Sequence, residues 1–132
     1  MLKVLQELDG CNLECDGLSR LISGLLMSAD IKHSLHVGRI KDMRNGNSIL
    51  HFWIVLDNNQ TIDFRAKMWL GDRSHIPHGI FFQKDWNEVL YEDEEEISLG
   101  HQNVSIAKIL AFTSDVDFDS ILLKLKMNKN TN

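Results

Sequence analysis

The sequence is poor in the residues that disulfide scaffolds, disordered linkers and membrane spans require. Its 132 residues include only 2 Cys and 1 Pro, whereas a disulfide framework in so small a chain uses more cysteines. No apolar run approaches the roughly 18 residues that suggest a transmembrane helix. Basic residues are also scarce, with 14 Lys and Arg against 19 Asp and Glu, which argues against a general nucleic-acid-binding protein. We therefore expect neither a membrane nor a nucleic-acid partner.

The remaining composition is that of an ordinary globular domain, with 43% hydrophobic and 25% charged residues. The length predicts a single domain over residues 1–126, followed by a flexible C-terminal tail at 127–132. The first residues lack the continuous apolar core and cleavage site of a signal peptide. Together with two unpaired thiols, this predicts a cytoplasmic protein, with export as an effector through a dedicated secretion route as the alternative.

The first half of the chain contains one well-marked helix followed by strands. Apolar residues at helical spacing predict an amphipathic helix over about 16–28, and residues 2–8 form a short helix or a lead-in. Strands are expected at 35–41, 48–56 and 60–64, separated by the Asn45-Gly46 turn and the Asp57-Asn58-Asn59 loop. This pattern predicts an antiparallel meander from 35 to about 66.

The second half is less regular. Pro77 and Gly79 mark a loop within 67–91, and the acidic run at 92–96 is interpreted as a solvated loop or helix end, or as a surface that steers a basic partner. Residues 103–112 fit either a helix or a strand. A final helix is expected after a cap at Ser114 or Asp115. The fold class is therefore α+β.

Cys15 stands at the start of the strongest predicted helix, where unpaired N–H groups and the helix dipole favour a thiolate. His51 lies in the most apolar predicted strand, and Asp63 lies on the next one. A rigidly held histidine accepts a thiol proton, and a neighbouring acid orients the imidazole. These three residue types in this order are therefore the candidate catalytic residues.

Strand geometry makes the pairing of His51 with Asp63 testable, because both side chains must lie on one face of the sheet. A three-residue loop at 57–59 pairs Leu56 with Gln60 and brings Asp63 opposite Trp53, diagonal to His51. A two-residue turn would instead send Asp63 to the other face. The hypothesis thus predicts the three-residue loop or a bulge.

These motifs, which read Cys15-Asp16-Gly17-Leu18-Ser19, His51-Phe52-Trp53-Ile54 and Ile62-Asp63, resemble the papain-like cysteine hydrolase superfamily and its transglutaminase-like branch. The resemblance covers roughly residues 11–70. It implies a nucleophile at Cys15, a base at His51 and an orienting acid at Asp63. It also implies a thioester intermediate in hydrolysis, deamidation or acyl transfer on an amide or acyl bond of a protein or peptide substrate, and a papain-like, transglutaminase-like core in which the cysteine helix packs on an antiparallel sheet. No cofactor and no metal are expected.

Several alternatives stay open at this stage. Each of the three residues has a purely structural reading, and Cys11 is a rival nucleophile or a redox partner of Cys15. The second oxyanion donor, beside the Cys15 N–H, is a side chain such as Gln6 or Asn12. The aromatic residues Trp69, Phe81, Phe82 and Trp86 pack the core or a lid, or line a cleft. The His-x2-His pairs at 33–36 and 75–78 are weak zinc signals. The rival function is a catalytically inactive papain-like domain that binds or inhibits a protein partner.

Overall fold

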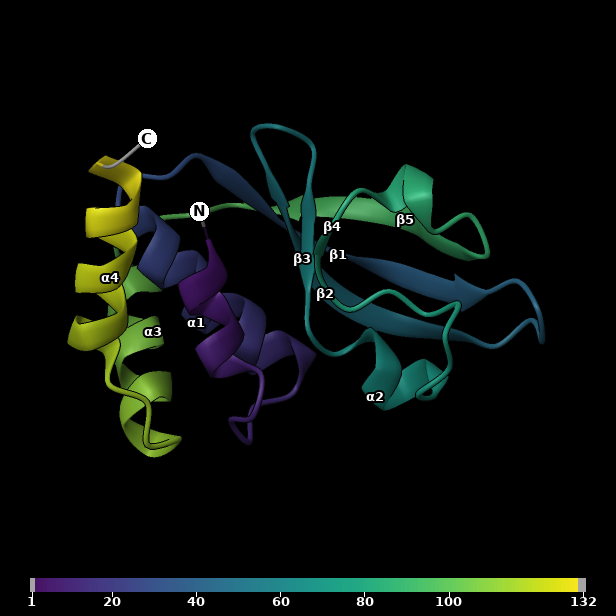
Figure 1. The fold of residues 1–132 in the computed structure, drawn as a ribbon, viewed down its shortest axis with the longest axis horizontal. Coiled ribbons are helices and arrows are strands. Elements are labelled where there is room, and N and C mark those ends of the chain that lie inside the picture. Colours follow the sequence, from purple (N-terminus) through teal and green to yellow (C-terminus); the bar gives the residue numbers. More distant parts are fainter. Residues whose placement is uncertain (1, 131–132) are drawn as a thin grey trace.

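The computed structural model describes residues 2–130 as a mixed α+β domain with one antiparallel sheet. Three helices, α1, α3 and α4, gather at one end of the molecule, and the sheet extends away from them (Figure 1). The elements in chain order are η1 (Lys3–Leu8), α1 (Cys15–Ser28), β1 (His33–Asp42), β2 (Ser48–Leu56), β3 (Thr61–Asp63), α2 (Ala66–Leu70), β4 (Gly79–Phe81), η2 (Gln83–Asp85), β5 (Val89–Ile97), α3 (Gln102–Thr113) and α4 (Phe118–Asn130). The α+β class predicted from the sequence is confirmed.

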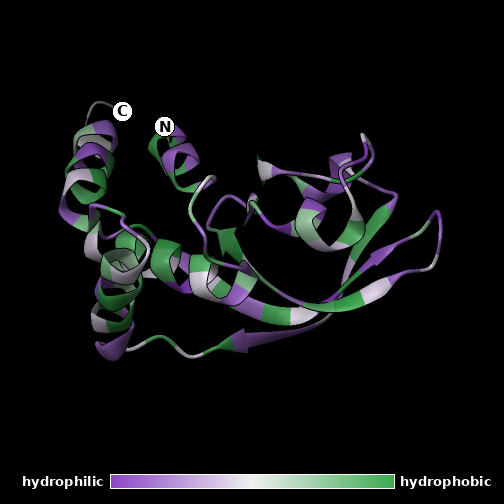
Figure 2. Ribbon diagram, turned by 90° about the horizontal axis from the view of Figure 1, so that it is seen from below, coloured by the Kyte–Doolittle hydropathy of each residue, from purple (hydrophilic) through white to green (hydrophobic). Residues whose placement is uncertain are grey.

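Among the described residues, the sheet has five strands in the order β4-β3-β2-β1-β5, and neighbouring strands pair antiparallel. Figure 2 shows its long, curved course from the helical end to the β1–β2 hairpin. The meander predicted for 35 to 66 therefore forms, and β2 has the bounds expected from its bulky, strand-favouring residues. β1 begins two residues before its predicted start.

The apolar face of α1 lies in the larger of two core clusters, together with η1, one face of the sheet and the inner faces of α3 and α4. Its predicted stripe of Leu18, Leu21, Ile22, Leu25 and Leu26 is at most 2% exposed. A second, smaller cluster gathers Ile40, Trp53, Ala66, Leu70, Ile76 and Val89. Because neighbours along a strand point to opposite faces, Ile54 belongs to the first cluster and Trp53 to the second.

Some expectations for the second half of the chain are wrong. The acidic run at 92–96 is neither a loop nor a helix end, because it lies within β5, an edge strand paired only with β1 among the described strands. An edge strand leaves charged side chains in water, so its acidic composition is compatible with a strand. The segment 67–91 also contains more regular structure than expected, namely α2, β4, η2 and the start of β5.

The start of the last helix also differs from its prediction. Ser114 ends α3, with its hydroxyl donating to the Leu110 carbonyl, and Asp115 adopts a left-handed backbone with φ 57°. Asp117 instead caps α4 by accepting a hydrogen bond from the Ser120 N–H at 3.1 Å. Residues 103–112 are helical within α3. The helix α4 continues through 127–130, residues that the sequence analysis assigned to the tail, and 131–132 lie outside the described residues.

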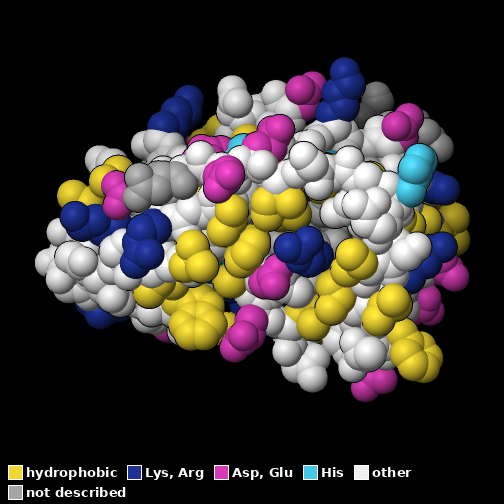
Figure 3. Space-filling model, turned by 180° about the vertical axis from the view of Figure 1, so that it is seen from behind, with side chains coloured by type: hydrophobic (Ala, Val, Ile, Leu, Met, Phe, Trp, Pro, Cys, Tyr) yellow, Lys and Arg dark blue, Asp and Glu magenta, His cyan; other side chains and the backbone are white. Residues whose placement is uncertain are grey.

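Apolar side chains are interspersed with both signs of charge on the face shown in Figure 3. Over the described residues, no helix is long and apolar enough to cross a membrane.

The contact between α1 and α3 predicts a large effect of a small substitution. A β-carbon at Gly24 would lie 2.1 Å from the β-carbon of Ala107, so Gly24 lets the two helices approach closely. We expect Gly24→Ala to lower the free energy of unfolding by about 1–3 kcal/mol through overpacking, in spite of the higher helix propensity of alanine. Urea denaturation measures this change.

Gly10→Ala is the matched control, because nothing lies within 4 Å of a β-carbon at Gly10. Its effect should stay within about 0.5 kcal/mol of zero. Equal stability of the two variants would show that the helices can separate at no cost.

Candidate active site

Cys15 is the first residue of α1, and its side chain is half-buried. The preceding Glu14 has an extended backbone and makes no side-chain hydrogen bond to the helix. Since the first N–H groups of a helix have no partner within the helix, the start of α1 presents donors beside the thiol. This arrangement suits a developing negative charge on sulfur or on a substrate oxygen.

The loop between β2 and β3 has the length that the pairing of His51 with Asp63 requires. The register pairs Ile54 with Ile62 and Val55 with Thr61. The Leu56 N–H donates to the Gln60 carbonyl at 2.8 Å, which closes a three-residue loop at 57–59. Asn59 adopts the left-handed conformation with φ 70°, which a loop of this type needs. The three-residue loop predicted from the sequence is therefore confirmed.

As a consequence, His51 and Asp63 form a buried hydrogen bond. The His51 Nε2 lies 2.8 Å from the Asp63 Oδ2, and the two side chains are 0% and 2% exposed. Two further donors hold the carboxylate. The Tyr91 hydroxyl donates to Oδ2 at 2.7 Å, and the Arg65 backbone N–H donates to Oδ1 at 2.9 Å. Both oxygens of Asp63 are thus engaged, which fixes its orientation toward the imidazole.

The environment of His51 raises its pKa. Burial alone would lower it, but the charge of Asp63 and the hydrogen bond to it, followed by the hydrogen bonding and charge of the Cys15 thiol, raise the pKa of His51 to about 9. The thiol therefore lies close enough to interact with the ring. His51 Nδ1 is buried and has no hydrogen bond of ordinary geometry among the described residues. With Nε2 bound to Asp63, Nδ1 is the nitrogen left to exchange a proton with Cys15.

Tyr91 and Trp53 complete the surroundings of this pair. Burial, the charge of Asp63 and the hydrogen bond to it raise the pKa of Tyr91 well above its usual value, so the hydroxyl stays protonated and keeps donating. The Trp53 ring stacks at 6.5 Å from His51 and meets Tyr91 edge-on at 4.9 Å. Trp53 packs in the core, with no exposed surface.

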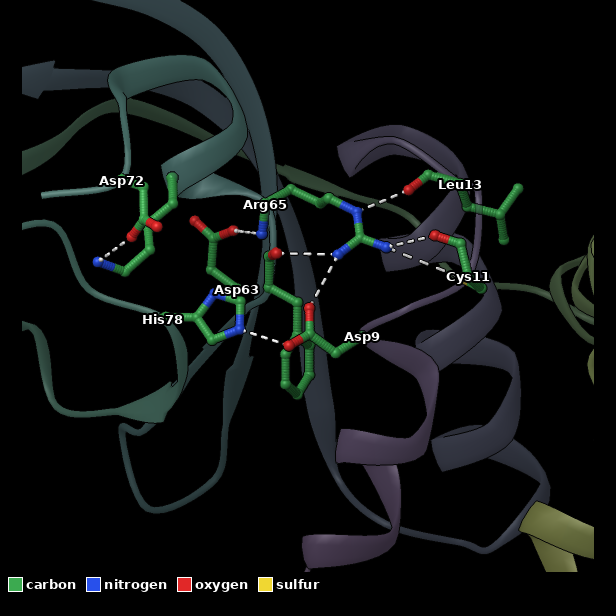
Figure 4. A network of polar contacts seen from close by, with 9 residues as sticks. Asp9, Cys11, Leu13, Asp63, Arg65, Asp72 and His78 are labelled. Atoms are coloured by element: carbon green, nitrogen blue, oxygen red, sulfur yellow. Dashed lines mark hydrogen bonds and ion pairs between the residues drawn. The ribbon is translucent and has the colours of Figure 1, made fainter.

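Arg65 connects Asp63 with the loop that leads to Cys15 (Figure 4). Its guanidinium donates to the carbonyls of Leu13 at 2.7 Å and Cys11 at 2.9 Å, and to Asp9 at 3.2 Å. Its own side chain is only 5% exposed. One residue therefore holds the orienting acid through its backbone and the approach to Cys15 through its side chain.

The rival residues lie in other surroundings. Cys11 precedes α1, and its Sγ lies 3.8 Å from the Arg65 guanidinium. Cys11 is not among the groups that shift the pKa of His51, whereas Cys15 is. Gln6 lines a cavity together with residues 30–32, which follow the C-terminal end of α1. Because Cys15 lies at the other end of α1, the Gln6 side chain is remote from it. Asn12 is exposed. Of the oxyanion donors expected from the sequence, the Cys15 N–H is therefore the best placed.

The four histidines of the His-x2-His pairs each have partners of their own. In the described part of the chain, no group of three His, Cys, Asp or Glu side chains is placed to hold a metal ion. The partners are Ser23 and Ile31 for His33, Ser34 and Glu94 for His36, Asp42 for His75, and Asp9 for His78.

Of the aromatic residues singled out in the sequence, Phe81 and Trp86 pack edge-on at 6.2 Å, and Trp69 on α2 is 43% exposed. A shallow hollow of about 550 Å³ lies beside Arg65 and is lined by Phe64, Arg65, Lys67, Met68, Asp72 and His78. None of the four aromatic residues lines it.

Sequence reasoning missed Tyr91 and Arg65. Tyr91 reaches Asp63 only because β5 pairs with β1 and places Tyr91 opposite Ile40, a contact between distant segments. Arg65 follows Asp63 by two residues, and its partners lie 52 to 56 residues earlier in the chain. The only signal for Arg65 in the local sequence was a basic residue two positions after Asp63.

Comparisons of the chain with protein-family models, with curated proteins and with solved structures found no match.

The buried pair predicts an unusual titration. We expect the His51 imidazole to titrate at about pH 9 in the folded protein, observed by nuclear magnetic resonance of the ring protons. Asp63→Asn removes the carboxylate charge and leaves the burial, so the His51 pKa should fall below its usual value of about 6.5. His51→Asn, which removes these ring protons, assigns the resonances.

The same shift fixes the sign of a stability change. Because the folded pKa of about 9 exceeds the unfolded value near 6.5, the stabilisation is fully present below about pH 6.5 and is lost as the pH rises through 9. It amounts to about 3 kcal/mol at most. A His51 that titrates at its usual value in the wild type would contradict the ion pair.

Proposed function

We propose that the protein is a cysteine-dependent hydrolase, deamidase or acyltransferase with a papain-like, transglutaminase-like core. The observation that carries this proposal is the buried His51–Asp63 hydrogen bond beside the thiol at the start of α1, with the pKa of His51 raised by both partners. His51 Nδ1 makes no hydrogen bond of ordinary geometry among the described residues. The same holds for Nδ1 of the buried His75, so the neighbouring Cys15 thiol is the feature that distinguishes His51.

The chemistry follows from this geometry. Because the charged form of His51 is favoured, the thiol proton already rests on His51 Nδ1, and the Cys15 thiolate forms a bond from Sγ to the carbonyl carbon of an amide. The oxygen gains the electron pair, stabilised by N–H groups at the start of α1. The carbon–nitrogen bond then breaks, and the imidazolium gives its proton to the leaving amine. A thioester remains on Cys15.

The thioester is resolved by the reverse sequence of proton transfers. His51 removes a proton from water, which gives hydrolysis or deamidation, or from an amine, which gives acyl transfer. The sulfur leaves as a thiolate beside the imidazolium, which keeps the proton. Asp63 holds the ring in one tautomer and stabilises the imidazolium throughout. Tyr91 and Arg65 keep Asp63 in place.

The burial of His51 leaves Cys15 as the group that an incoming substrate can reach. His51 has no exposed surface, whereas Cys15 is only half-buried, so a substrate carbonyl contacts the sulfur before it contacts the base. We place a protein or peptide side chain in the shallow hollow beside Arg65, which borders the loop that leads to Cys15. Two free thiols suit a reducing compartment, and we propose the cytoplasm.

A second candidate is a catalytically inactive domain that binds a protein partner. The exposed carboxylates of Glu94, Glu95 and Glu96 on the edge strand β5 favour it, because they would attract a basic segment. Such a domain has no need of a reactive thiol, so one experiment separates the two candidates.

Labelling with iodoacetamide tests which cysteine is activated. We expect Cys15 to react at least about tenfold faster than Cys11, because a neighbouring base promotes formation of the thiolate. Cys11→Ala should keep the fast labelling, and Cys15→Ala should abolish it. His51→Asn should slow the labelling of Cys15 by a similar factor. Intact-mass spectrometry over time measures each rate.

The control is His33→Asn. It removes a histidine outside the proposed triad that bonds to Ser23, a residue of the helix α1 that begins at Cys15. Labelling at the same rate in wild type, His51→Asn and His33→Asn would favour the binding domain over the enzyme.

A further inference from the structure

Asp9 lies between two hydrogen-bond donors, at the start of the loop that leads to Cys15 (Figure 4). Its Oδ1 accepts a hydrogen bond from Arg65 Nη1 at 3.2 Å, and its Oδ2 accepts one from His78 Nε2 at 2.7 Å. Because a carboxylate can only accept hydrogen bonds, the His78 imidazole carries a proton on Nε2. The two donors lie 56 and 69 residues after Asp9 in the sequence, so these contacts form only in the folded chain.

The Arg65 guanidinium holds this loop at every second residue. It donates to the Asp9 carboxylate and to the carbonyls of Cys11 at 2.9 Å and Leu13 at 2.7 Å, and Cys15 is the next residue in this series. Among the described residues, Asp9 supplies the only carboxylate that forms an ion pair with Arg65, whose side chain is 5% exposed. A buried cation without a partner is costly, so Asp9 ties the guanidinium to the loop.

His78 connects the other oxygen of Asp9 with the hydrophobic core. The His78 ring meets the Phe64 ring edge-on at 5.5 Å, and Phe64 is buried in the larger core cluster. His78 directly precedes β4, which pairs with β3, the strand that carries Asp63. The hydrogen bond from His78 to Asp9 therefore links the loop before Cys15 to the part of the sheet that holds Asp63.

We propose that Asp9 and His78 are positioning residues for Cys15, an inference that rests on the proposed function. Together with Arg65, they hold the loop over residues 9–14 in the place that puts the thiol beside His51. Both residues act through the position of the sulfur and take no part in the transfer of protons.

The rate at which iodoacetamide labels Cys15 in the full chain tests this proposal, with peptide mapping by mass spectrometry to distinguish Cys15 from Cys11. Asp9→Ala should slow the labelling at least about fivefold, because the thiol is no longer held beside its base. His78→Ala should slow it about threefold, the size expected for loss of one half-exposed charged contact. His78→Gln keeps a side-chain N–H donor and should restore most of the rate.

A double-mutant cycle separates positioning from a general loss of stability. With His51→Asn the base is absent, so adding Asp9→Ala should change the rate by less than about twofold. The matched control is Glu88→Gln, which breaks the ion pair with Arg44 next to the β1–β2 turn. Glu88 is 43% exposed and Asp9 42%, so the two substitutions remove carboxylates of similar exposure. Glu88→Gln should label at the wild-type rate, and urea denaturation checks that each variant is folded.

Three outcomes would count against the proposal. Labelling of Asp9→Ala at the wild-type rate would show that Asp9 does not position the thiol, and the proposed function would stand. An equal loss of rate with His51 present or replaced would show that Asp9 acts on stability or exposure instead. Labelling of Cys15 in the wild type no faster than that of Cys11 would contradict the proposed function, and the positioning roles with it.

Discussion

The hydrogen bond between His51 and Asp63 depends on one detail of backbone geometry, and the candidate site depends on that bond. The three-residue loop after β2 sets the register of β3, and a loop one residue shorter would send Asp63 to the opposite face of the sheet. With the shorter loop, the fully buried His51 imidazole would have no carboxylate partner, and desolvation would keep it neutral. With the partner in place, the charged form is favoured and the pKa of His51 rises to about 9.

The carboxylate is held as firmly as the ring that it orients. Tyr91 from the opposite edge of the sheet and the backbone of Arg65 supply donors to its two oxygens. Because the Arg65 side chain also holds the loop from Asp9 to Leu13, Asp63 and the approach to Cys15 are linked through one residue. This linkage joins the end of β3 to a segment that lies 52 to 56 residues earlier in the sequence. Of the three candidate residues, Cys15 is the least buried.

The parts of the site that could be predicted are those encoded by local patterns. The helix that begins at Cys15 follows from the spacing of Leu18, Leu21 and Leu25, and the placement of Asp63 follows from the loop at 57–59. Tyr91 and Arg65 could not be predicted, because their partners come from segments joined only by tertiary folding. The acidic run was misassigned because charge indicates exposure to water, which an edge strand provides as readily as a loop does.

The proposed role of Cys15 as a nucleophile toward acyl groups depends on the buried His51–Asp63 pair. Single-turnover acylation with an activated ester, followed by peptide mapping of the adduct, tests this dependence. We expect a thioester on Cys15 in the wild type, and acylation slowed at least about tenfold in a folded Asp63→Asn variant. An adduct on Cys11, or acylation of Cys15 at the same rate in the variant, would contradict it.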